Sequence, residues 1–263
     1  MFELMTQTLL GRGIVITRPR EQSAALKAAI ESRGGRAILF PVLEIVEASD
    51  LAPINALIDR LDEFDIAVFI SPTAVDKAMN LIRARRELPA KLLKACIGRA
   101  SLREMRTFGV EDAIAPAAQF DSEHLLELAE FNNVAGKRVV IFRGDGGREW
   151  LGDELTRRGA AVEYAECYRR VRPNVDAGPL LHGWARGEID AVTVMSSESL
   201  HNLYDLIGKL GQQWLKKTAL FVPHARIADS ARSLGLARIH VSAPGDDGLL
   251  AQLETWAAGL SAP

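Results

Sequence analysis

Six loops of this sequence join a short apolar run to the start of a helical pattern, and they carry hydroxyl and guanidinium side chains. A helix start presents free backbone N–H groups and the positive end of the helix dipole, which attract carboxylates and phosphates. Arginine adds a planar fork of donors that binds the same anions. The candidate binding residues are Arg18, Ser71, Thr73, Arg99, Ser101, Arg143, Arg148, Ser196, Ser197, His224 and Arg226. Their types predict a site for an anionic small molecule.

Each of these loops also has a purely structural interpretation. Ser71 at an N-cap followed by Pro72 begins a helix well without any ligand. His224 fits either a general acid/base at a strand end or a surface or capping residue. Tyr168 fits either a phenol donor or a strand tyrosine packed on one face. Six such loops favour binding more than any one does, because ligands of parallel sheets lie beyond the carboxyl ends of the strands.

The composition disfavours several other kinds of site. The 263 residues carry a formal net charge of −2, so no global field favours nucleic acid. Two cysteines and five histidines without ligand spacing predict neither a metal site nor a disulfide framework. The segment 143–148 lacks a phosphate-loop motif, which disfavours a nucleotide site. No Ser-His-Asp arrangement or cysteine nucleophile is indicated, so an enzyme here would work by binding and orienting its substrate.

No segment indicates export or a membrane partner. Met1–Leu10 has neither the basic region nor the long apolar region of a signal peptide. No apolar run approaches the roughly 20 residues that span a bilayer. We therefore expect a cytoplasmic protein.

Short β-branched runs alternate with amphipathic helical patterns along the chain. The predicted strands are 14–16, 37–46, 66–70, 95–97, 113–114, 139–142, 162–168, 191–195, 219–222 and 239–241. The predicted helices are 21–32, 74–85, 102–108, 122–131, 149–158, 200–206, 227–234 and 249–258. This alternation predicts parallel sheets with right-handed crossovers. About five strands in each half is the count of a flavodoxin-like sheet.

The sequence repeats itself after 125 residues. Gly11–Arg18 aligns with Gly136–Arg143 (143 − 18 = 125), and Asp65–Ser71 aligns with Asp190–Ser196. The same shift aligns Asp121 with Asp246. Each copy has the size of one domain, so the repeat predicts two similar domains with a cleft for a small molecule.

Two runs depart from a simple tandem of domains. Leu39–Glu47 and its repeat mate Tyr164–Val171 are polar where a buried central strand would be apolar. Charged residues such as Glu44 and Arg169 are costly to bury. Edge strands and exposed linkers both fit this pattern, and we interpret the runs as linkers between domains.

An ordered set of motifs resembles the uroporphyrinogen-III synthase family. The motifs extend over residues 11–256 in family order and with family-like spacing, and the ordered set is more specific than any one of them. They are Ile16-Thr17-Arg18-Pro19, Phe40-Pro41-Val42-Leu43-Glu44-Ile45, Phe69-Ile70-Ser71-Pro72-Thr73-Ala74-Val75, Ile97-Gly98-Arg99-Ala100-Ser101, Phe142-Arg143-Gly144, Arg148-Glu149-Trp150-Leu151, Tyr168-Arg169-Arg170 and Val222-Pro223-His224-Ala225-Arg226-Ile227-Ala228.

The resemblance implies an α/β fold of two similar flavodoxin-like parallel-sheet domains joined by a two-stranded linker. The first domain would be discontinuous, formed by residues 11–37 and 174–263, and the second would span 48–161. The linker strands would be 38–47 and 162–173. The boundary between the sequence copies, near Gly136, would then differ from the boundary between the domains.

The resemblance also implies a lyase that uses no cofactor. Members of this family cyclise hydroxymethylbilane, a linear tetrapyrrole rich in carboxylates, to uroporphyrinogen III. The reaction passes through a spiro intermediate and inverts ring D. As implied by the family, the chain would be a monomer that can receive its substrate from the preceding deaminase.

The resemblance assigns several of the family's site residues to single positions of this sequence. The family's linker tyrosine, suspected of helping the hydroxyl group leave, corresponds to Tyr168. Ser71 corresponds to the family's serine before proline, and Ser101 stands where the family has a threonine. Many members have glycine and threonine where this chain has His224 and Ile227, which makes His224 or Arg226 a substitute to test.

Two other functions fit the residues. A two-domain small-molecule binding or sensor protein would hold a ligand without changing it. A two-domain glycosyltransferase would bind a nucleotide sugar. Turnover of hydroxymethylbilane to the type III isomer distinguishes the family's activity from both.

Overall fold

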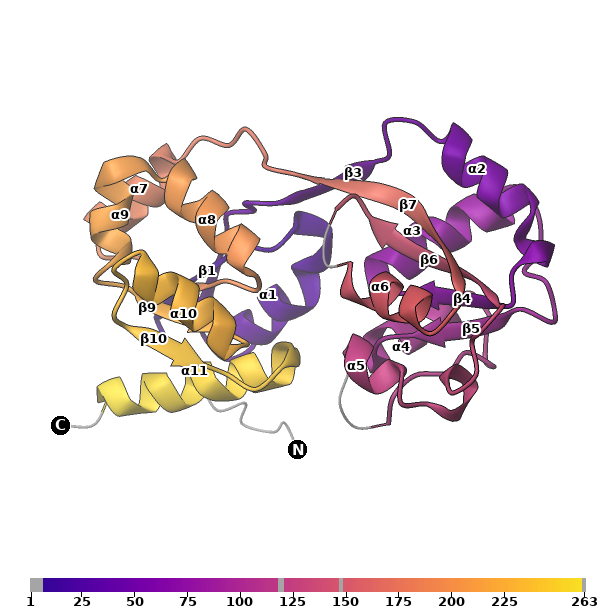
Figure 1. Ribbon diagram of the computed structural model, residues 1–263. Coiled ribbons are helices and arrows are strands. Elements are labelled where there is room, and N and C mark those ends of the chain that lie inside the picture. The colour runs from indigo at the N-terminus through magenta and orange to yellow at the C-terminus, as the bar shows by residue number, and fades with distance from the viewer. Residues whose placement is uncertain (1–6, 118–120, 147–148, 262–263) are drawn as a thin grey trace. The chain divides into compact units, whose positions relative to one another are not determined.

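A computed structural model describes residues 7–117, 121–146 and 149–261. The chain divides into two compact units (Figure 1). Unit 1 combines Met1–Glu44 with Val171–Pro263, and unit 2 is Ile45–Arg170. Arg148, one of the predicted binding residues, lies outside the described ranges.

Unit 1 is built around a five-stranded sheet whose four strand pairs are all parallel. The order is β10 (Ile239–Val241), β9 (Ala219–Val222), β8 (Ala191–Thr193), β1 (Gly13–Ile16) and β2 (Arg36–Leu39). Helices α1 (Ala24–Glu31) and α11 (Gly245–Ser261) contribute apolar side chains to one core cluster. The other cluster takes side chains from α7 (Gly178–Ala185), α8 (Ser197–Leu206), α9 (Gly208–Leu215) and α10 (Ala225–Ser233). The sheet is therefore buried on both faces, which explains its continuous apolar runs.

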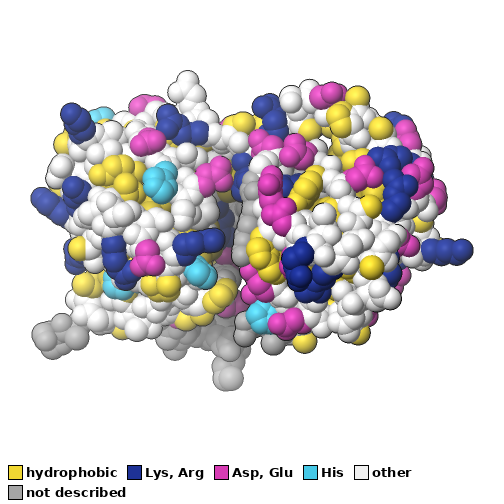
Figure 2. Space-filling model, viewed as in Figure 1, with side chains coloured by type: hydrophobic (Ala, Val, Ile, Leu, Met, Phe, Trp, Pro, Cys, Tyr) yellow, Lys and Arg dark blue, Asp and Glu magenta, His cyan; other side chains and the backbone are white. Residues whose placement is uncertain are grey.

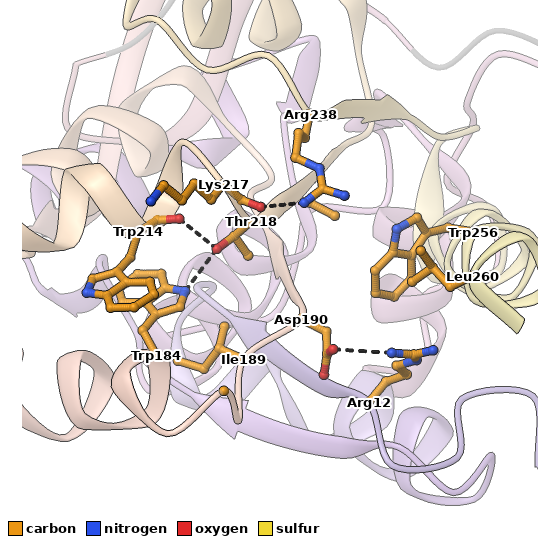
Figure 3. A pocket seen from close by; sticks show the side chains of 12 residues that line it. Arg12, Trp184, Ile189, Asp190, Trp214, Lys217, Thr218, Arg238, Trp256 and Leu260 are labelled. Atoms are coloured by element: carbon orange, nitrogen blue, oxygen red, sulfur yellow. Dashed lines mark hydrogen bonds and ion pairs between the residues drawn. The ribbon is translucent and has the colours of Figure 1, made fainter.

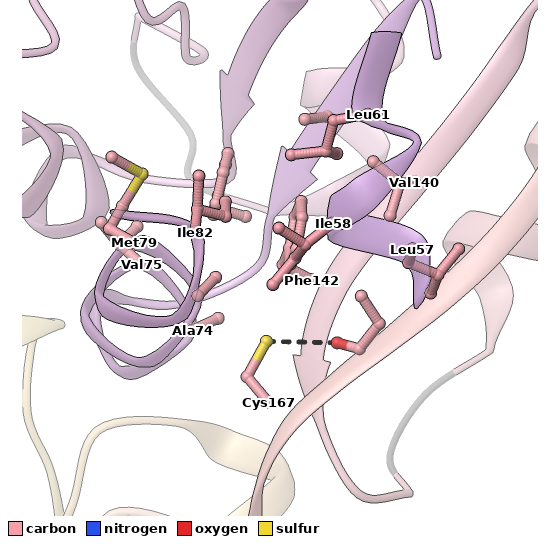
Figure 4. Close-up of a cluster of buried hydrophobic side chains, with 14 of the residues drawn as sticks. Leu57, Ile58, Leu61, Ala74, Val75, Met79, Ile82, Val140, Phe142 and Cys167 are labelled. Carbon is pink, nitrogen blue, oxygen red and sulfur yellow. Dashed lines mark hydrogen bonds between the residues drawn. The ribbon is translucent and has the colours of Figure 1, made fainter. Parts of the chain in front are cut away.

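Unit 2 repeats this plan with a second five-stranded sheet. The order is β3 (Glu44–Glu47), β7 (Ala161–Val171), β6 (Arg138–Gly144), β4 (Ile66–Phe69) and β5 (Leu93–Cys96). One core cluster, part of which Figure 4 shows, involves α2 (Ala52–Asp59), α3 (Pro72–Arg83) and α4 (Arg99–Thr107). The other takes side chains from α5 (Ser122–Leu125), the short turn Ala129–Phe131 and α6 (Trp150–Arg157).

The two halves of the 125-residue repeat pair their central strands in the same register. Ile14 lies opposite Ala191 in unit 1, and their repeat mates Val139 and Ile66 lie opposite each other in unit 2 (14 + 125 = 139; 66 + 125 = 191). Each central strand pair thus takes one strand from each copy of the repeat. The predicted fold class, with parallel sheets and a discontinuous first part, is confirmed.

At the start of each central strand pair, an aspartate carboxylate accepts a hydrogen bond from a backbone N–H of the partner segment. Asp190 accepts a hydrogen bond of 2.8 Å from the backbone N–H of Gly13. Asp65, its repeat mate, accepts one of 2.8 Å from the N–H of Arg138 (65 + 125 = 190; 13 + 125 = 138). The two copies of the repeat therefore share this carboxylate–amide hydrogen bond as well as the pairing of their strands.

The predicted linker ranges contain residues that belong to the sheets. Residues 38–39 lie in β2, at the edge of the first sheet, and β3 is the edge strand of the second. Residues 162–168 lie in β7, which pairs with β6 from Ala161 to Tyr168. The polar residues of this run fit because their charges are matched: Glu163 accepts hydrogen bonds of 3.1 Å from Arg60 and from Arg138. The edge-strand interpretation therefore describes β2 and β3, whereas β7 lies between β3 and β6 in the second sheet.

Several predicted elements differ from the structure. The helix predicted over 122–131 is two short pieces, and the strand predicted at 113–114 is a single bridge between Ile114 and Ala95. Helices α2, α7 and α9 were not predicted. Pro53 and Pro179 lie in the first turns of α2 and α7, where proline is tolerated because those N–H groups have no helical partner.

Both cysteines are buried in the core of unit 2. Cys96 ends β5 fully buried, and Cys167 in β7 points its Sγ at the carbonyl oxygen of Ala165, 3.3 Å away (Figure 4). Burial raises the pKa of each thiol to about 12, because a thiolate would be poorly solvated there. Neither thiol is a nucleophile at neutral pH.

We predict that neither cysteine reacts with a disulfide reagent in the folded protein at mildly alkaline pH. Reaction requires the thiolate, and burial suppresses both its formation and its access to the reagent. Titration in guanidinium should then count both thiols of the chain. Rapid modification of the native protein would contradict the burial of these side chains.

Gly13→Ala should destabilise unit 1 by about 3 kcal/mol, because a methyl group there collides with the carbonyl oxygen of Glu188. The nearest atoms are backbone atoms of Glu188, which cannot move aside as the end of a flexible side chain could. Gly259→Ala in α11 is the matched control: nothing lies within 4 Å of the added methyl, so it should stabilise by up to about 1 kcal/mol. Urea unfolding of both variants measures this difference, and equal shifts would refute the explanation.

Candidate functional site

Three predicted loops of unit 2 follow the carboxyl ends of parallel strands. β4 leads to Ser71, β5 leads to Gly98 and Arg99, and β6 ends with Arg143 and Gly144. These strands are parallel neighbours, so their loops gather at one edge of the sheet. Helices α3 and α4 begin at this edge, and a helix start leaves its first N–H groups without helical partners.

Ser71 and Tyr168 meet at this edge. The Oγ of Ser71 caps α3 by accepting a hydrogen bond of 3.0 Å from the N–H of Ala74. The same Oγ lies 3.3 Å from the hydroxyl oxygen of Tyr168, although the two residues are 97 positions apart. Tyr168 is only 6% exposed. The sequence singled out each residue, and the structure brings the two hydroxyls together.

Gly144 makes room for the tyrosine ring. A Cβ at Gly144 would lie 2.5 Å from the Cε2 of Tyr168, so any larger residue would displace the ring. The pairing of β6 with β7 shifts register between Arg143 and Gly144. Asp145 then donates its N–H to the carbonyl oxygen of Tyr168 at 2.9 Å, and its carboxylate accepts from the N–H of Arg170 at 2.8 Å. Asp145 thus holds the backbone from the carbonyl of Tyr168 to the N–H of Arg170.

Arg143 is engaged with its own loop. Its side chain is buried, and its Nε donates to the carbonyl oxygen of Gly144 at 3.1 Å. A second guanidinium nitrogen donates to the carbonyl oxygen of Gly146, and the guanidinium lies 4.8 Å from the ring centre of Tyr164. In this structure Arg143 orders the segment that supports Tyr168.

The other predicted residues of unit 2 lie at the starts of α3 and α4. Thr73 is half-buried in the first turn of α3, and Arg99 is the exposed first residue of α4. Arg99 donates to the carbonyl oxygen of Ala117 at 3.1 Å. Ser101 is 3% exposed, which leaves its hydroxyl little access to a large ligand. The backbone N–H groups of this helix start are therefore better placed for anions than the Ser101 hydroxyl.

In unit 1 the carboxyl ends of the parallel strands form the corresponding edge, and Arg18 follows β1 there. The guanidinium of Arg18 pairs with both carboxylate oxygens of Asp246, at 2.9 and 3.2 Å. The Arg18 side chain is 13% exposed and that of Asp246 is 35% exposed. Sequence reasoning did not assign Asp246 to the site, although its alignment with Asp121 was a signal that it stands at a comparable helix start.

Hydroxyl and imidazole groups cap the two other helices at this edge. Ser196 accepts from the N–H of Ser199 at 3.0 Å to begin α8, and the hydroxyl of Ser197 lies 3.2 Å from that of Ser230. His224 begins α10 with its Nδ1 accepting from the N–H of Arg226 at 3.1 Å. This geometry favours the capping interpretation of His224. Arg226 is exposed beside it.

Two buried hydroxyls beneath this edge were missed by sequence reasoning. Thr17 donates to the carbonyl oxygen of Thr193 at 2.7 Å, and Thr193 donates to that of Val15 at 3.0 Å. They join the ends of β1 and β8 directly below Arg18. No local pattern marks such a pair, since the partners are 176 positions apart.

The charge distribution makes any anion site a local one. On the visible faces of the units, Lys and Arg side chains are interspersed with Asp and Glu (Figure 2). Among the described residues, no three or more His, Cys, Asp or Glu side chains gather where they could hold a metal ion. Of the helices in the same ranges, none has the length and apolar character needed to span a bilayer.

Comparison with solved structures supports the fold. The chain superimposes on a mutant uroporphyrinogen III synthase from Thermus thermophilus with a TM-score of 0.64, covering 95% of this chain and 98% of the other at 19% identity. A uroporphyrinogen-III synthetase from Helicobacter pylori gives a TM-score of 0.54 at 13% identity, with 95% and 99% covered. At these identities the likeness concerns the fold alone.

Comparison of sequences identifies the family. Residues 24–251 match the family model described as uroporphyrinogen-III synthase HemD. The uroporphyrinogen-III synthase of Salmonella typhimurium is 35% identical over 244 residues, 92% of this chain and 99% of the relative. That of Escherichia coli is 34% identical over the same shares. The chain therefore belongs to the uroporphyrinogen-III synthase family, whose members are lyases of tetrapyrrole biosynthesis.

Proposed function

We propose that this protein cyclises hydroxymethylbilane to uroporphyrinogen III. The observation that carries the proposal is the match to named synthases over 99% of their own length, which leaves almost no part of those relatives without a counterpart here. The geometry adds a part-buried pair of hydroxyls, Ser71 and Tyr168, beside helix starts suited to carboxylates.

The reaction requires departure of one hydroxyl group and control of one ring closure. Protonation of the hydroxyl releases water and leaves an azafulvene cation. The substituted carbon of the last ring attacks this cation and forms a spiro intermediate. That intermediate fragments, the ring turns over and recloses, and a proton is lost. The net change is loss of one water molecule, and no cofactor takes part.

Tyr168 is proposed to donate a hydrogen bond to the departing hydroxyl. Ser71 has one proton and already accepts from the N–H of Ala74. When Ser71 donates its proton to the Tyr168 oxygen, the phenol O–H is free to point at substrate. The burial of Tyr168 strengthens such a bond, because little water competes for it. Ser71 would thus orient the phenol, and Gly144 would leave space for its ring.

The carboxylates of the substrate are proposed to meet the helix starts and arginines. In unit 2 these are the starts of α3 and α4 with Thr73, Arg99 and Ser101. In unit 1 they are Arg18 and the starts of α8 and α10 with Ser196, Ser197, His224 and Arg226. Arg143 is proposed to act through its loop, and Arg148 is retained from the sequence as a candidate.

The setting of the reaction is part of the same proposal. We infer a monomer acting in the cytoplasm without nucleic acid or membrane partners. Hydroxymethylbilane closes spontaneously without ring inversion, so rapid transfer from the deaminase that makes it would limit that loss. Capture of substrate before spontaneous closure is the property that matters most for this enzyme.

The activity is tested with purified protein and freshly made hydroxymethylbilane. Chromatography of the oxidised products should show the type III isomer in excess of type I. Type I alone, formed at the uncatalysed rate, would overturn the proposed activity. Binding without turnover would instead support a binding or sensor protein.

Tyr168→Phe should lower kcat by about tenfold or more, a loss of roughly 1.4 kcal/mol of transition-state stabilisation. The ring stays and only the proposed donor is removed. Tyr164→Phe, in the same strand, is the matched control and should change kcat little. An unchanged kcat for Tyr168→Phe, with normal folding by circular dichroism, would assign Tyr168 to packing.

Asp246→Asn should lower KM, because it frees the Arg18 guanidinium from a competing carboxylate. A partly exposed ion pair is worth up to about 1 kcal/mol, so the expected change is roughly two- to fivefold. Arg18→Ala should raise KM. If Asp246→Asn raises KM instead, Asp246 positions Arg18 and does not compete with substrate.

A further inference from the structure

A cavity of about 370 Å³ opens at the amino ends of the strands in unit 1. The loops of the candidate site lie at the opposite, carboxyl ends of these strands. The lining of the cavity includes the residues just before the strands: Arg12 before β1, Asp190 before β8, Thr218 before β9 and Arg238 before β10. A volume of this size lies in the range of small-molecule sites in proteins. Neither the family's residues nor the proposed reaction involves this edge.

The walls of the cavity are aromatic. Trp184 from α7 and Trp214 from α9 lie on one side, and Trp256 from α11 lies on the other with Leu260 (Figure 3). These are three of the four tryptophans in the chain. The two sides belong to the core layers on opposite faces of the sheet, so the cavity is lined by indole rings from both layers.

Hydrogen bonds hold one of these walls in place. The indole N–H of Trp184 donates to the hydroxyl of Thr218 at 3.0 Å, and that hydroxyl donates to the carbonyl oxygen of Trp214 at 2.9 Å (Figure 3). Both tryptophans are thereby tied to the residue that precedes β9. A wall fixed before binding loses little conformational entropy when a ligand arrives.

The rim of the cavity is cationic. Among the described lining residues, Arg12, Lys217 and Arg238 contribute three positive charges and Asp190 the single carboxylate, which leaves a net charge of +2 (3 − 1 = 2). Asp190 lies 3.4 Å from the Arg12 guanidinium, which also lies 6.0 Å from the ring centre of Trp256. Arg238 donates to the backbone carbonyl oxygen of Lys217 at 2.7 Å, which ties its guanidinium to the segment before β9.

The fold itself does not require this opening. The repeat mate of Trp256 is Phe131 (131 + 125 = 256), which is fully buried in the core of unit 2. The repeat mate of Arg238 is Ala113 (113 + 125 = 238). At these two positions unit 2 therefore has apolar residues, one of them fully buried, where unit 1 has an aromatic wall and a cationic rim.

We propose that this cavity binds a planar aromatic anion, with its ring against the indole side chains of the lining and its negative group against the cationic rim. Aromatic stacking and charge-assisted hydrogen bonds to a guanidinium supply the two halves of the recognition. A mononucleotide and an aromatic carboxylate share this chemistry. The site is separate from the proposed reaction and does not depend on it.

Calorimetric titration tests the proposal with four probes. AMP and naphthoate carry both a ring and a charge, adenosine carries only the ring system, and inorganic phosphate carries only the charge. At least one of the first two should bind, and adenosine and phosphate should bind at least tenfold more weakly. Failure of both AMP and naphthoate to bind, or equal binding of adenosine, overturns the proposal.

Variants locate the site. Arg238→Ala and Lys217→Ala should each weaken binding about tenfold, as expected for loss of a charge-assisted hydrogen bond. Arg232→Ala is the matched control: this exposed arginine of α10 pairs with Asp229 and lies outside the cavity lining. Binding that is unchanged in both Arg238→Ala and Lys217→Ala places the ligand elsewhere and overturns the assignment.

Tryptophan fluorescence gives an independent measure. In Trp150→Phe the three remaining tryptophans all line the cavity (4 − 1 = 3). Saturable quenching by whichever probe binds in calorimetry, with the same dissociation constant, is expected in this variant. Binding by calorimetry without any change in this fluorescence would rule out the cavity.

Discussion

The structure depends on one strand pairing, that of β1 with β8 and its repeat mate, β6 with β4. Parallel strands need a connection that returns to the same end of the sheet, and here the partner of β1 lies far ahead in the sequence. The chain must therefore leave unit 1 after β2, build unit 2, and return. The discontinuous unit, the edge position of β2 and the pairing of β3 with β7 all follow from this pairing. Asp190 and Asp65 mark it with equivalent carboxylate–amide bonds.

The same pairing gives each sheet an edge rich in helix starts. Strands that run parallel deliver their loops together, so residues far apart in sequence such as Ser71 and Tyr168 become neighbours. Unit 2 has a part-buried pair of hydroxyls at this edge, whereas unit 1 has an arginine–carboxylate pair at the equivalent edge. Two copies of one plan thus offer different chemistry, a phenol donor in one and a guanidinium in the other.

Sequence reasoning reached the strands and most helices because their apolar patterns are local. It named Ser71 and Tyr168 separately, but their contact depends on the register between β6 and β7 and on the space above Gly144, which no local pattern reveals. It assigned Arg143 to substrate, whereas the guanidinium is occupied by carbonyl oxygens of its own loop. Asp246 was not assigned to the site for a similar reason, since its partner Arg18 is 228 positions away. Glu163 of β7 suggested an exposed run, because its partners Arg60 and Arg138 lie on other elements and are not visible in the local sequence.

The interleaved order of the strands has a consequence for synthesis on the ribosome. β1 emerges 175 residues before β8, its partner in the sheet (191 − 16 = 175). Unit 2 is complete in sequence by Arg170, so it can fold while the first 44 residues still wait for theirs. Throughout that interval the apolar strand Gly13–Ile16 lacks its partner β8 and the helices of residues 178–261 that pack on its sheet. The time needed to translate residues 171–193 therefore sets how long this strand edge stays unpaired.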